Sequence, residues 1–181
     1  MKKKWFIVII GIIMILAILL ILPLCKKVQI TTSTMLYRNG NSDESQPITI
    51  SLDGTYKRFL TKQNTFEGSI EITGIEELSY INSEQLSLVF HNNTAVLYFM
   101  HYNAEKGDFE SQMLGDLIID DSFDNFMLTV FEPVTAEVSG KTWSITGGLF
   151  LTNNAQSRDD AIENAKALCR DNEWFSEIIW K

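Results

Sequence analysis

The feature that most constrains this chain is an uncharged apolar run of twenty residues from Trp5 to Leu24. Lysines flank the run at positions 2–4 and 26–27. Twenty residues of α-helix rise about 30 Å, which matches the hydrocarbon thickness of a bilayer. The run has no polar stripe of the kind that a surface helix of a globular domain shows. We therefore predict that residues 1–27 form a membrane anchor and that the chain binds the lipid bilayer through Trp5 to Leu24.

Two other kinds of N-terminal segment are alternatives. A cleaved secretory signal has an apolar region of roughly 7–15 residues and ends in small residues, whereas this run is longer and ends Ile21-Leu22-Pro23-Leu24. A lipoprotein signal would use Cys25, but Leu24 stands where that motif has a small residue. The length and the missing cleavage signal favour an uncleaved anchor over cleavage or lipidation.

The lysines also predict an orientation. Three lysines precede the apolar run and two follow it, and cytoplasmic flanks of membrane helices carry the excess of positive charge. This imbalance favours a single-pass protein of the cell membrane, with its N-terminus in the cytoplasm and its C-terminal domain outside.

Residues 28–181 have the length of one ordinary domain. They contain all 23 acidic residues but only 10 of the 15 basic ones, so their net charge is about −13. Such a charge disfavours nucleic acid and anionic lipid headgroups as partners. The two cysteines, Cys25 and Cys169, are too few and too far apart to form a disulfide framework. Both features are typical of an extracytoplasmic domain of a bacterial protein.

The pattern of this domain is mainly that of β-strands. Apolar and polar residues alternate in short segments bounded by turn residues, which is typical of antiparallel sheets. We predict about nine strands, separated by polar loops at 39–47 and 103–111. The strands are expected at 28–37, 48–52, 66–73, 86–90, 95–99, 113–119, 125–131, 134–138 and 142–146, the last continuing at 149–152.

Three tight turns are predicted. Asp53-Gly54-Thr55 and Ser139-Gly140-Lys141 have the glycine that hairpin turns favour. Asn92-Asn93 tolerates the positive φ angles of a type I′ turn. The hairpin around Asn92-Asn93 would pair Leu88 with Leu97 on a buried face.

A helical period replaces the alternation near the C-terminus. Ser157 and Asp160 have the spacing of a capping box, and apolar residues then recur at helical spacing, which predicts an amphipathic helix at about 157–170. The apolar residues at 174–180 predict that the terminus docks as a short helix or a last strand. The expected fold is an N-terminal transmembrane helix followed by an antiparallel β-sandwich or partly open barrel, with one helix packed on the sheet.

Few side chains suggest chemistry. The predicted hairpin separates His91 from His101 by more than about 20 Å, so the two histidines are not expected to bind one metal. Cys169 lies on the apolar stripe of the predicted helix, which indicates a buried structural thiol rather than a nucleophile.

Two larger groups have a structural and a functional interpretation. An acidic cluster would be either a solvated turn or a Ca²⁺ site, although its spacing is not that of an EF-hand. It consists of Asp116, Asp120, Asp121 and Asp124. Scattered aromatic residues would pack in the core or form a platform for sugars. They are Tyr98, Tyr102, Trp143, Trp174 and Trp180.

The sequence contains no nucleotide-binding, zinc-protease or serine-hydrolase motif. We therefore predict no catalytic, cofactor-binding or metal-binding residue, and a protein that binds a ligand or partner. One alternative is a structural or assembly subunit of an envelope complex, acting through the predicted helix or the apolar run. A less favoured one is an envelope hydrolase that pairs Glu67 or Glu71 with the acidic cluster, which requires a pocket with two carboxyl groups about 5–10 Å apart.

Overall fold

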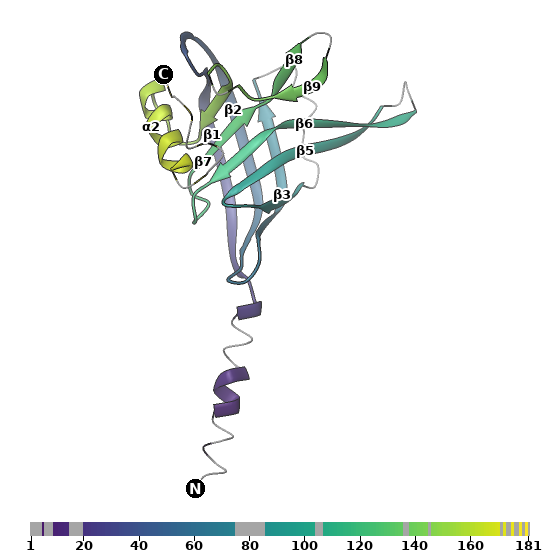
Figure 1. Cartoon of the computed structure of the whole chain (residues 1–181), viewed down its shortest axis with the longest axis vertical. Helices are drawn as coiled ribbons and strands as arrows, with labels where there is room; N and C mark the ends of the chain where they lie inside the picture. Colours follow the sequence, from purple (N-terminus) through teal and green to yellow (C-terminus); the bar gives the residue numbers. More distant parts are fainter. Residues whose placement is uncertain are drawn as a thin grey trace.

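The computed structural model describes residues 5, 9–14, 20–74, 86–103, 107–135, 138–144, 146–170, 172, 175, 178 and 180. Over these ranges the chain is a mainly antiparallel β-structure with one C-terminal helix packed on the sheet (Figure 1). The predicted β-rich class is therefore confirmed.

An eight-stranded antiparallel sheet forms most of the domain. Its strand order is β4-β3-β2-β1-β10-β7-β6-β5. The strands are β1 (Leu24–Arg38), β2 (Asn41–Arg58), β3 (Asn64–Thr73), β4 (Leu86–Phe90), β5 (Thr94–Asn103), β6 (Asp108–Ile119), β7 (Phe126–Val130) and β10 (Leu149–Thr152). A separate two-stranded sheet contains β8 (Glu132–Thr135) and β9 (Val138–Thr142), and α2 is Arg158–Cys169.

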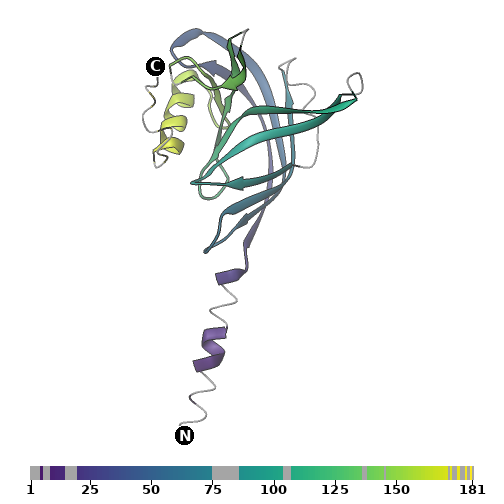
Figure 2. The same ribbon diagram turned by 45° about the vertical axis from the view of Figure 1, so that its right-hand side comes forward.

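The two edge strands, β4 and β5, are consecutive in the chain and meet at the Asn92-Asn93 turn. Asn92 and Asn93 have φ angles of 48° and 61°, so the predicted left-handed turn is confirmed. His91 and Thr94, which directly flank the turn, form an isolated β-bridge between the two strands. The sheet is therefore nearly closed and barrel-like, and of the two predicted architectures it is the partly open barrel (Figure 2).

The predicted pairing of Leu88 with Leu97 is wrong. Leu88 pairs with Phe66 of β3, and Leu97 pairs with Gly115 of β6. Both leucines are buried in one core, as the alternation predicted. Leu88 reaches that core from β4, which pairs with β3, and Leu97 reaches it from β5, which pairs with β6.

The loop predicted at 39–47 and the hairpin predicted at 53–55 are also wrong. The chain turns at Gly40, whose φ is 79°, and β2 then pairs with β1, with one register shift between Tyr37 and Arg38, until Arg58 lies opposite Leu24. Gly54 faces Gly68 across β2 and β3. A Cβ atom on Gly54 would lie 2.6 Å from Cζ of Phe66. This glycine therefore makes room for an aromatic ring inside the sheet and does not form a turn.

Two further turns are displaced from their predicted positions. Strand β6 begins at Asp108, inside the loop predicted at 103–111. Thr135 pairs with Val138, so the β8–β9 turn precedes the predicted one at 139–141. The strands predicted at 66–73 and 149–152 are confirmed as β3 and β10.

The core inside the sheet is closed by an aromatic cluster. The rings of Tyr56 and Phe123 are 5.3 Å apart and meet edge to face, and Phe66 and Phe90 lie 5.4 and 5.9 Å from Phe123. Phe123 comes from the loop between β6 and β7, is 1% exposed, and has a φ of 56°. A bulky residue adopts this conformation only where its surroundings impose it.

Asp120 is the residue that shapes this loop. One carboxylate oxygen accepts hydrogen bonds from the backbone and hydroxyl of Ser122 and from the backbone of Asp124. The other accepts from the backbone and side chain of Asn125. Burial alone would raise the pKa of Asp120, but these hydrogen bonds outweigh burial and hold its pKa below the usual value. Its ionised form thus stabilises the loop that carries Phe123.

Helix α2 covers the outer face of the sheet. The predicted helix at 157–170 is confirmed, and the Ser157 hydroxyl caps it by accepting a hydrogen bond from the Asp160 backbone at 3.2 Å. Its buried face packs on side chains of β6, β7 and β10. The helix contributes Ala161, Ile162, Ala165 and Cys169, the strands contribute Ile118, Met127 and Phe150, and the C-terminal segment contributes Phe175, Ile178 and Trp180. The last three bear out the predicted docking of the terminus at those positions.

The N-terminal segment extends away from the end of the domain where β1 begins (Figures 1 and 2). Its described residues, Trp5, 9–14 and 20–21, are helical and mostly exposed. Over the part of the chain that the structure describes, no helix has both the length and the apolar character that a membrane crossing requires. Leu24, the last residue of the apolar run, already pairs with Arg58 in the sheet.

We expect Asp120→Ala to lower the free energy of unfolding at pH 7 by roughly 2 kcal/mol, because it removes the acceptors of several local hydrogen bonds. The loss should shrink as pH falls below the usual value of 3.8, because the contribution of a carboxylate with a lowered pKa disappears when it is protonated. Urea denaturation at pH 7 and pH 3 measures both effects. Asp121→Ala, an exposed change in the same loop, is the control and should cost less than about 1 kcal/mol.

Candidate functional site

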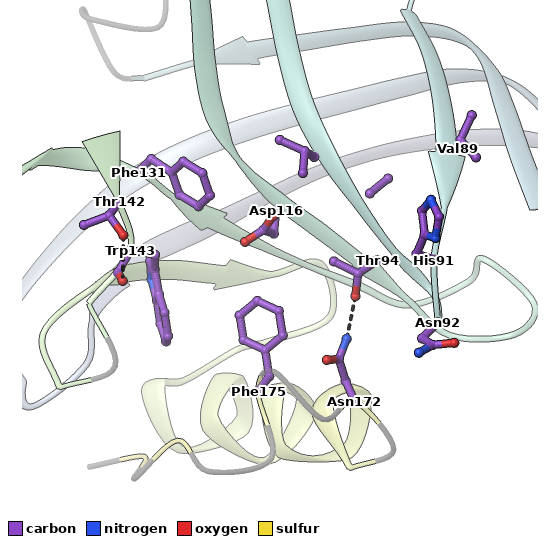
Figure 3. A pocket seen from close by; sticks show the side chains of 12 residues that line it. Val89, His91, Asn92, Thr94, Asp116, Phe131, Thr142, Trp143, Asn172 and Phe175 are labelled. Atoms are coloured by element: carbon purple, nitrogen blue, oxygen red, sulfur yellow. Dashed lines mark hydrogen bonds between the residues drawn. The ribbon is translucent and has the colours of Figure 1, made fainter. Parts of the chain in front are cut away.

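A cavity of about 590 Å³ lies on the outer face of the sheet, beside α2 (Figure 3). We call it the α2 pocket. Its wall combines apolar and aromatic side chains with a few polar ones, which is the usual composition of a small-molecule site. The lining residues are Val89, His91, Asn92, Thr94, Ala95, Val96, Asp116, Phe131, Thr142, Trp143, Asn172 and Phe175.

The aromatic wall is held in place by Trp143. Its indole Nε1 donates a hydrogen bond to the backbone oxygen of Leu149 at 2.7 Å, and its ring lies 6.0 Å from that of Phe175. Gly148 passes directly under the indole, where a Cβ atom would lie 2.3 Å from Nε1. Trp180 supports the indole from another side, with ring centroids 6.1 Å apart. The wall is therefore preformed.

Two hydrogen bonds fix the polar side of the pocket. The buried Asn172 donates from Nδ2 to the Thr94 hydroxyl at 2.6 Å, which ties the segment after α2 to β5 (Figure 3). His91 Nδ1 and Gln63 Nε2 lie 2.9 Å apart in a second hydrogen bond. The polar side of the pocket is thus hydrogen-bonded both to the C-terminal segment and to the loop after β2.

Asp116 is the one carboxylate among the described residues that line this pocket. It lies on β6 opposite Val96, and its backbone N–H donates to the Thr129 hydroxyl at 2.9 Å. Over the described part of the chain, no hydrogen bond or ion pair reaches its carboxylate oxygens. Burial without a counter-charge raises its pKa to about 6. A partly buried carboxylate without a counter-charge lowers the stability of the fold while it is ionised.

A second cavity of about 390 Å³ lies on the other side of Asn172 and includes Asp120 and Asp121. Its carboxylates already have partners. Asp121 accepts from Asn93 at 2.8 Å, and Asp120 is bonded within its own loop. The predicted acidic cluster is therefore divided, because Asp116 points into the α2 pocket whereas the others serve the β6–β7 loop.

Asp124 completes that loop by an ion pair with Lys26 at the start of β1. The hydrogen bond from Lys26 holds the pKa of the Asp124 carboxyl below its usual value. In the ranges that the structure covers, no three His, Cys, Asp or Glu side chains are placed to hold a metal ion.

The structure places the other predicted candidates as follows. Cys169 lies on the buried face of α2, and burial raises the pKa of its thiol to about 12 and keeps it protonated. His101 lies seven residues along β5 from Thr94, opposite Glu110, and its side chain is outside the described part. Trp143 and Trp180 pack together, Tyr98 is 45% exposed on β5, and Trp174 and the side chain of Tyr102 lie outside the described residues.

The hypothesis of two catalytic carboxylates has no site in this pocket. Glu67 and Glu71 lie exposed on β3, and Glu67 forms an ion pair with Lys57 at 2.6 Å. Neither glutamate lines the α2 pocket.

Sequence reasoning grouped Asp116 with the loop acids and missed Asn172 and Phe175. One signal for Asp116 was present, since it is a single acid within the apolar strand Leu114 to Ile119. Phe175 belongs to the apolar segment 174–180 that predicted docking of the terminus, but nothing in that segment indicated a pocket, and Asn172 carried no signal.

Comparison of the chain with protein-family models, with curated proteins and with solved structures finds no match. Inference of function therefore depends on the chemistry of the pocket itself.

We expect Asp116→Asn to stabilise the ligand-free protein at pH 8, because the wild type holds an ionised carboxylate there without a counter-charge. The shift from 3.8 to about 6 corresponds to at most about 3 kcal/mol, and solvent screening reduces this to roughly 1–2 kcal/mol. The gain should vanish below about pH 4, where the carboxyl is protonated in both folded and unfolded chains. Thermal denaturation from pH 4 to 8 measures it. Glu163→Gln, an exposed change on α2, should show no such pH-dependent gain.

Proposed function

We propose that this protein is a membrane-anchored binding protein whose β-domain lies outside the cytoplasm and binds an organic cation in the α2 pocket. The observation that carries the proposal is the Asp116 carboxylate, which lines a largely apolar cavity and has no partner among the described residues. The preference for binding over catalysis agrees with the motif content of the sequence.

The ligand class follows from the two chemical components of the pocket. A carboxylate in a weakly polar setting attracts a positive charge more strongly than one in water. The faces of aromatic rings, here Trp143 and Phe175, also attract ammonium groups. Figure 3 shows these rings and Asp116 around one space. An ammonium ion with an apolar body satisfies both components, whereas an anion or a sugar leaves Asp116 without a counter-charge.

The membrane anchor is supported by the exposure of the N-terminal segment. Ile12, Ile13 and Met14 are 52%, 59% and 62% exposed, and the segment points away from the domain (Figure 1). An apolar segment of this size requires an apolar environment, and a bilayer provides one. The lysine imbalance favours a cytoplasmic N-terminus.

The proposed ligand class is tested with benzyltrimethylammonium and its uncharged carbon analogue, neopentylbenzene, by calorimetry on the detergent-solubilised chain. We expect the cation to bind at least about tenfold more tightly than the neutral analogue, since an ion pair and cation–π contacts each contribute in a partly buried site. Asp116→Asn should remove this preference. Asp53→Asn, which changes an exposed carboxylate on β2, should not alter it.

Affinity for the cation should fall about tenfold per pH unit below pH 6, because protonation of Asp116 removes the charge that binds it. His91 also lines the pocket, so the titration is repeated with His91→Gln. Equal binding of the cation and the neutral analogue at pH 8 would refute the proposed ligand class.

The two cysteines allow a direct test of orientation, because Cys25 is exposed and Cys169 is buried. A membrane-impermeant maleimide should label wild-type protein in intact spheroplasts, and Cys25→Ser should abolish the labelling. Labelling only after permeabilisation would reverse the proposed orientation. No labelling in either condition, together with a changed intact mass, would indicate cleavage or lipidation instead of an anchor.

A further inference from the structure

The loop between β2 and β3 (residues 59–63) lies beside the end of the apolar run. The Thr61 hydroxyl donates a hydrogen bond to the backbone oxygen of Leu20 at 3.2 Å. Strand β1 begins at Leu24, and Leu24 pairs with Arg58 immediately before the loop. No spacer separates the apolar run from the sheet, so a membrane that contains the run lies next to this loop.

The loop has a defined shape that presents one apolar side chain. The backbone of Phe59 donates to the Asn64 side chain at 2.9 Å, and the Lys62 ammonium lies 3.9 Å from the centre of the Phe59 ring. Gln63 is bonded to His91 at 2.9 Å. These contacts leave Leu60 pointing into solvent, with 65% of its surface exposed. An apolar side chain held outward beside a membrane segment is suited to the lipid interface.

Basic side chains gather at this end of an otherwise acidic domain. They are Lys26, Lys27, Lys57, Arg58 and Lys62, and the strand pairing of β1 with β2 brings the first four together.

Three of the five basic residues form ion pairs, with Asp124, Glu67 and Asp121. Lys27 and Lys62 are exposed and have no acidic partner within the described ranges. Asp120, which shapes its own loop, is the fourth acidic residue of this end.

The charge of this end differs from that of the rest of the domain. Outside it, residues 28–181 contain seven basic and nineteen acidic residues. Repulsion from anionic lipid, expected from the net charge of the domain, therefore applies to the remainder and not to this end.

We propose that the β2–β3 loop is a lipid-contacting element, in which Leu60 enters the headgroup layer of the leaflet and Lys27 and Lys62 contact lipid phosphates. The inference rests on the proposed anchor, which brings the bilayer to this end of the domain. Lysine side chains reach from an apolar boundary to phosphates because their stems are flexible and apolar. Anionic lipids strengthen such contacts through the surface potential of the leaflet. The loop and the anchor together would hold the domain in one orientation on the membrane.

The experiment uses the full chain with Cys25→Ser, reconstituted in vesicles of mixed zwitterionic and anionic phospholipids. Leu60→Cys carries an environment-sensitive NBD fluorophore, and the buried Cys169 stays unlabelled. Thr73→Cys is the matched control, because Thr73 is exposed at the far end of β3, about 30 Å from Asn64 at 3.3 Å per residue. We expect the label at position 60 to show blue-shifted emission and strong quenching by nitroxide lipids near the headgroups. The label at position 73 should show neither.

A second variant tests the charge. Lys62→Glu in the Leu60→Cys background should reduce the quenching at position 60, and raising the salt concentration should do the same to the parent. Equal emission and quenching at positions 60 and 73 would overturn the inference. Carbonate extraction of the same vesicles separates this failure from that of the anchor, since an extracted chain disproves the anchor itself. Binding of benzyltrimethylammonium in detergent reports on the pocket independently of both.

Discussion

The rest of the structure depends on the pairing of β1 with β2 over their whole length. The register runs from Leu24 opposite Arg58 to Tyr37 opposite Ser45, and it then shifts so that Arg38 lies opposite Asn41. Fifteen and eighteen residues make these strands long for a small domain. They therefore set the length of the sheet, which curves until its two edge strands meet at Asn92-Asn93. The same pairing joins the last residue of the apolar run to the domain, so the position of the run relative to the sheet is set by backbone hydrogen bonds.

Because the sheet is nearly closed, its inner and outer faces pack against different side chains. The inner face is filled by aromatic and aliphatic side chains and is closed by Phe123. The backbone of Phe123 has a positive φ angle, and the hydrogen bonds of Asp120 hold the loop in that conformation. On the outer face, α2 packs on side chains of β6, β7 and β10 and on Tyr37 of β1. The α2 pocket forms at the border of this cover, and there Asp116 occurs within the apolar segment Leu114 to Ile119 at the end of β6. This partly buried carboxylate without a partner among the described residues is the feature on which the proposed binding site rests.

The sequence predicted the β-class, α2 and its cap, and the Asn92-Asn93 turn, because each depends on local chemistry. The serine hydroxyl of Ser157 bonds within its own turn, and asparagine tolerates a positive φ wherever the strands go. Gly54 shows why other turns were misplaced. A glycine in a strand pattern is compatible with a turn or with a close contact between strands. Which of the two Gly54 forms depends on the ring of Phe66, which is distant in the sequence.

The candidate site was much less predictable, because its walls come from β4, β5, β6, the segment after β9 and the residues after α2. Asp116 was visible in the sequence as an acid in the apolar segment Leu114 to Ile119, but its separation from Asp120 depends on β6 ending at Ile119, after which Asp120 bonds within the β6–β7 loop. Trp143 was identified as an aromatic candidate. Its position depends on Gly148 and on partners near the C-terminus, Phe175 and Trp180. Such long-range packing leaves no periodic signal.

The hydrogen bond between Gln63 and His91 connects the two proposed surfaces. Gln63 ends the loop proposed to contact lipid, and His91 lines the pocket proposed to bind a cation. A loop fixed at the headgroup layer would therefore fix one wall of the pocket close to the membrane. Amphiphilic cations are concentrated at anionic membrane surfaces by the surface potential, so a pocket at this height would meet its ligand where the ligand is most abundant. The lipid-contacting loop and the carboxylate of Asp116 would then serve one function, capture of organic cations at the membrane surface.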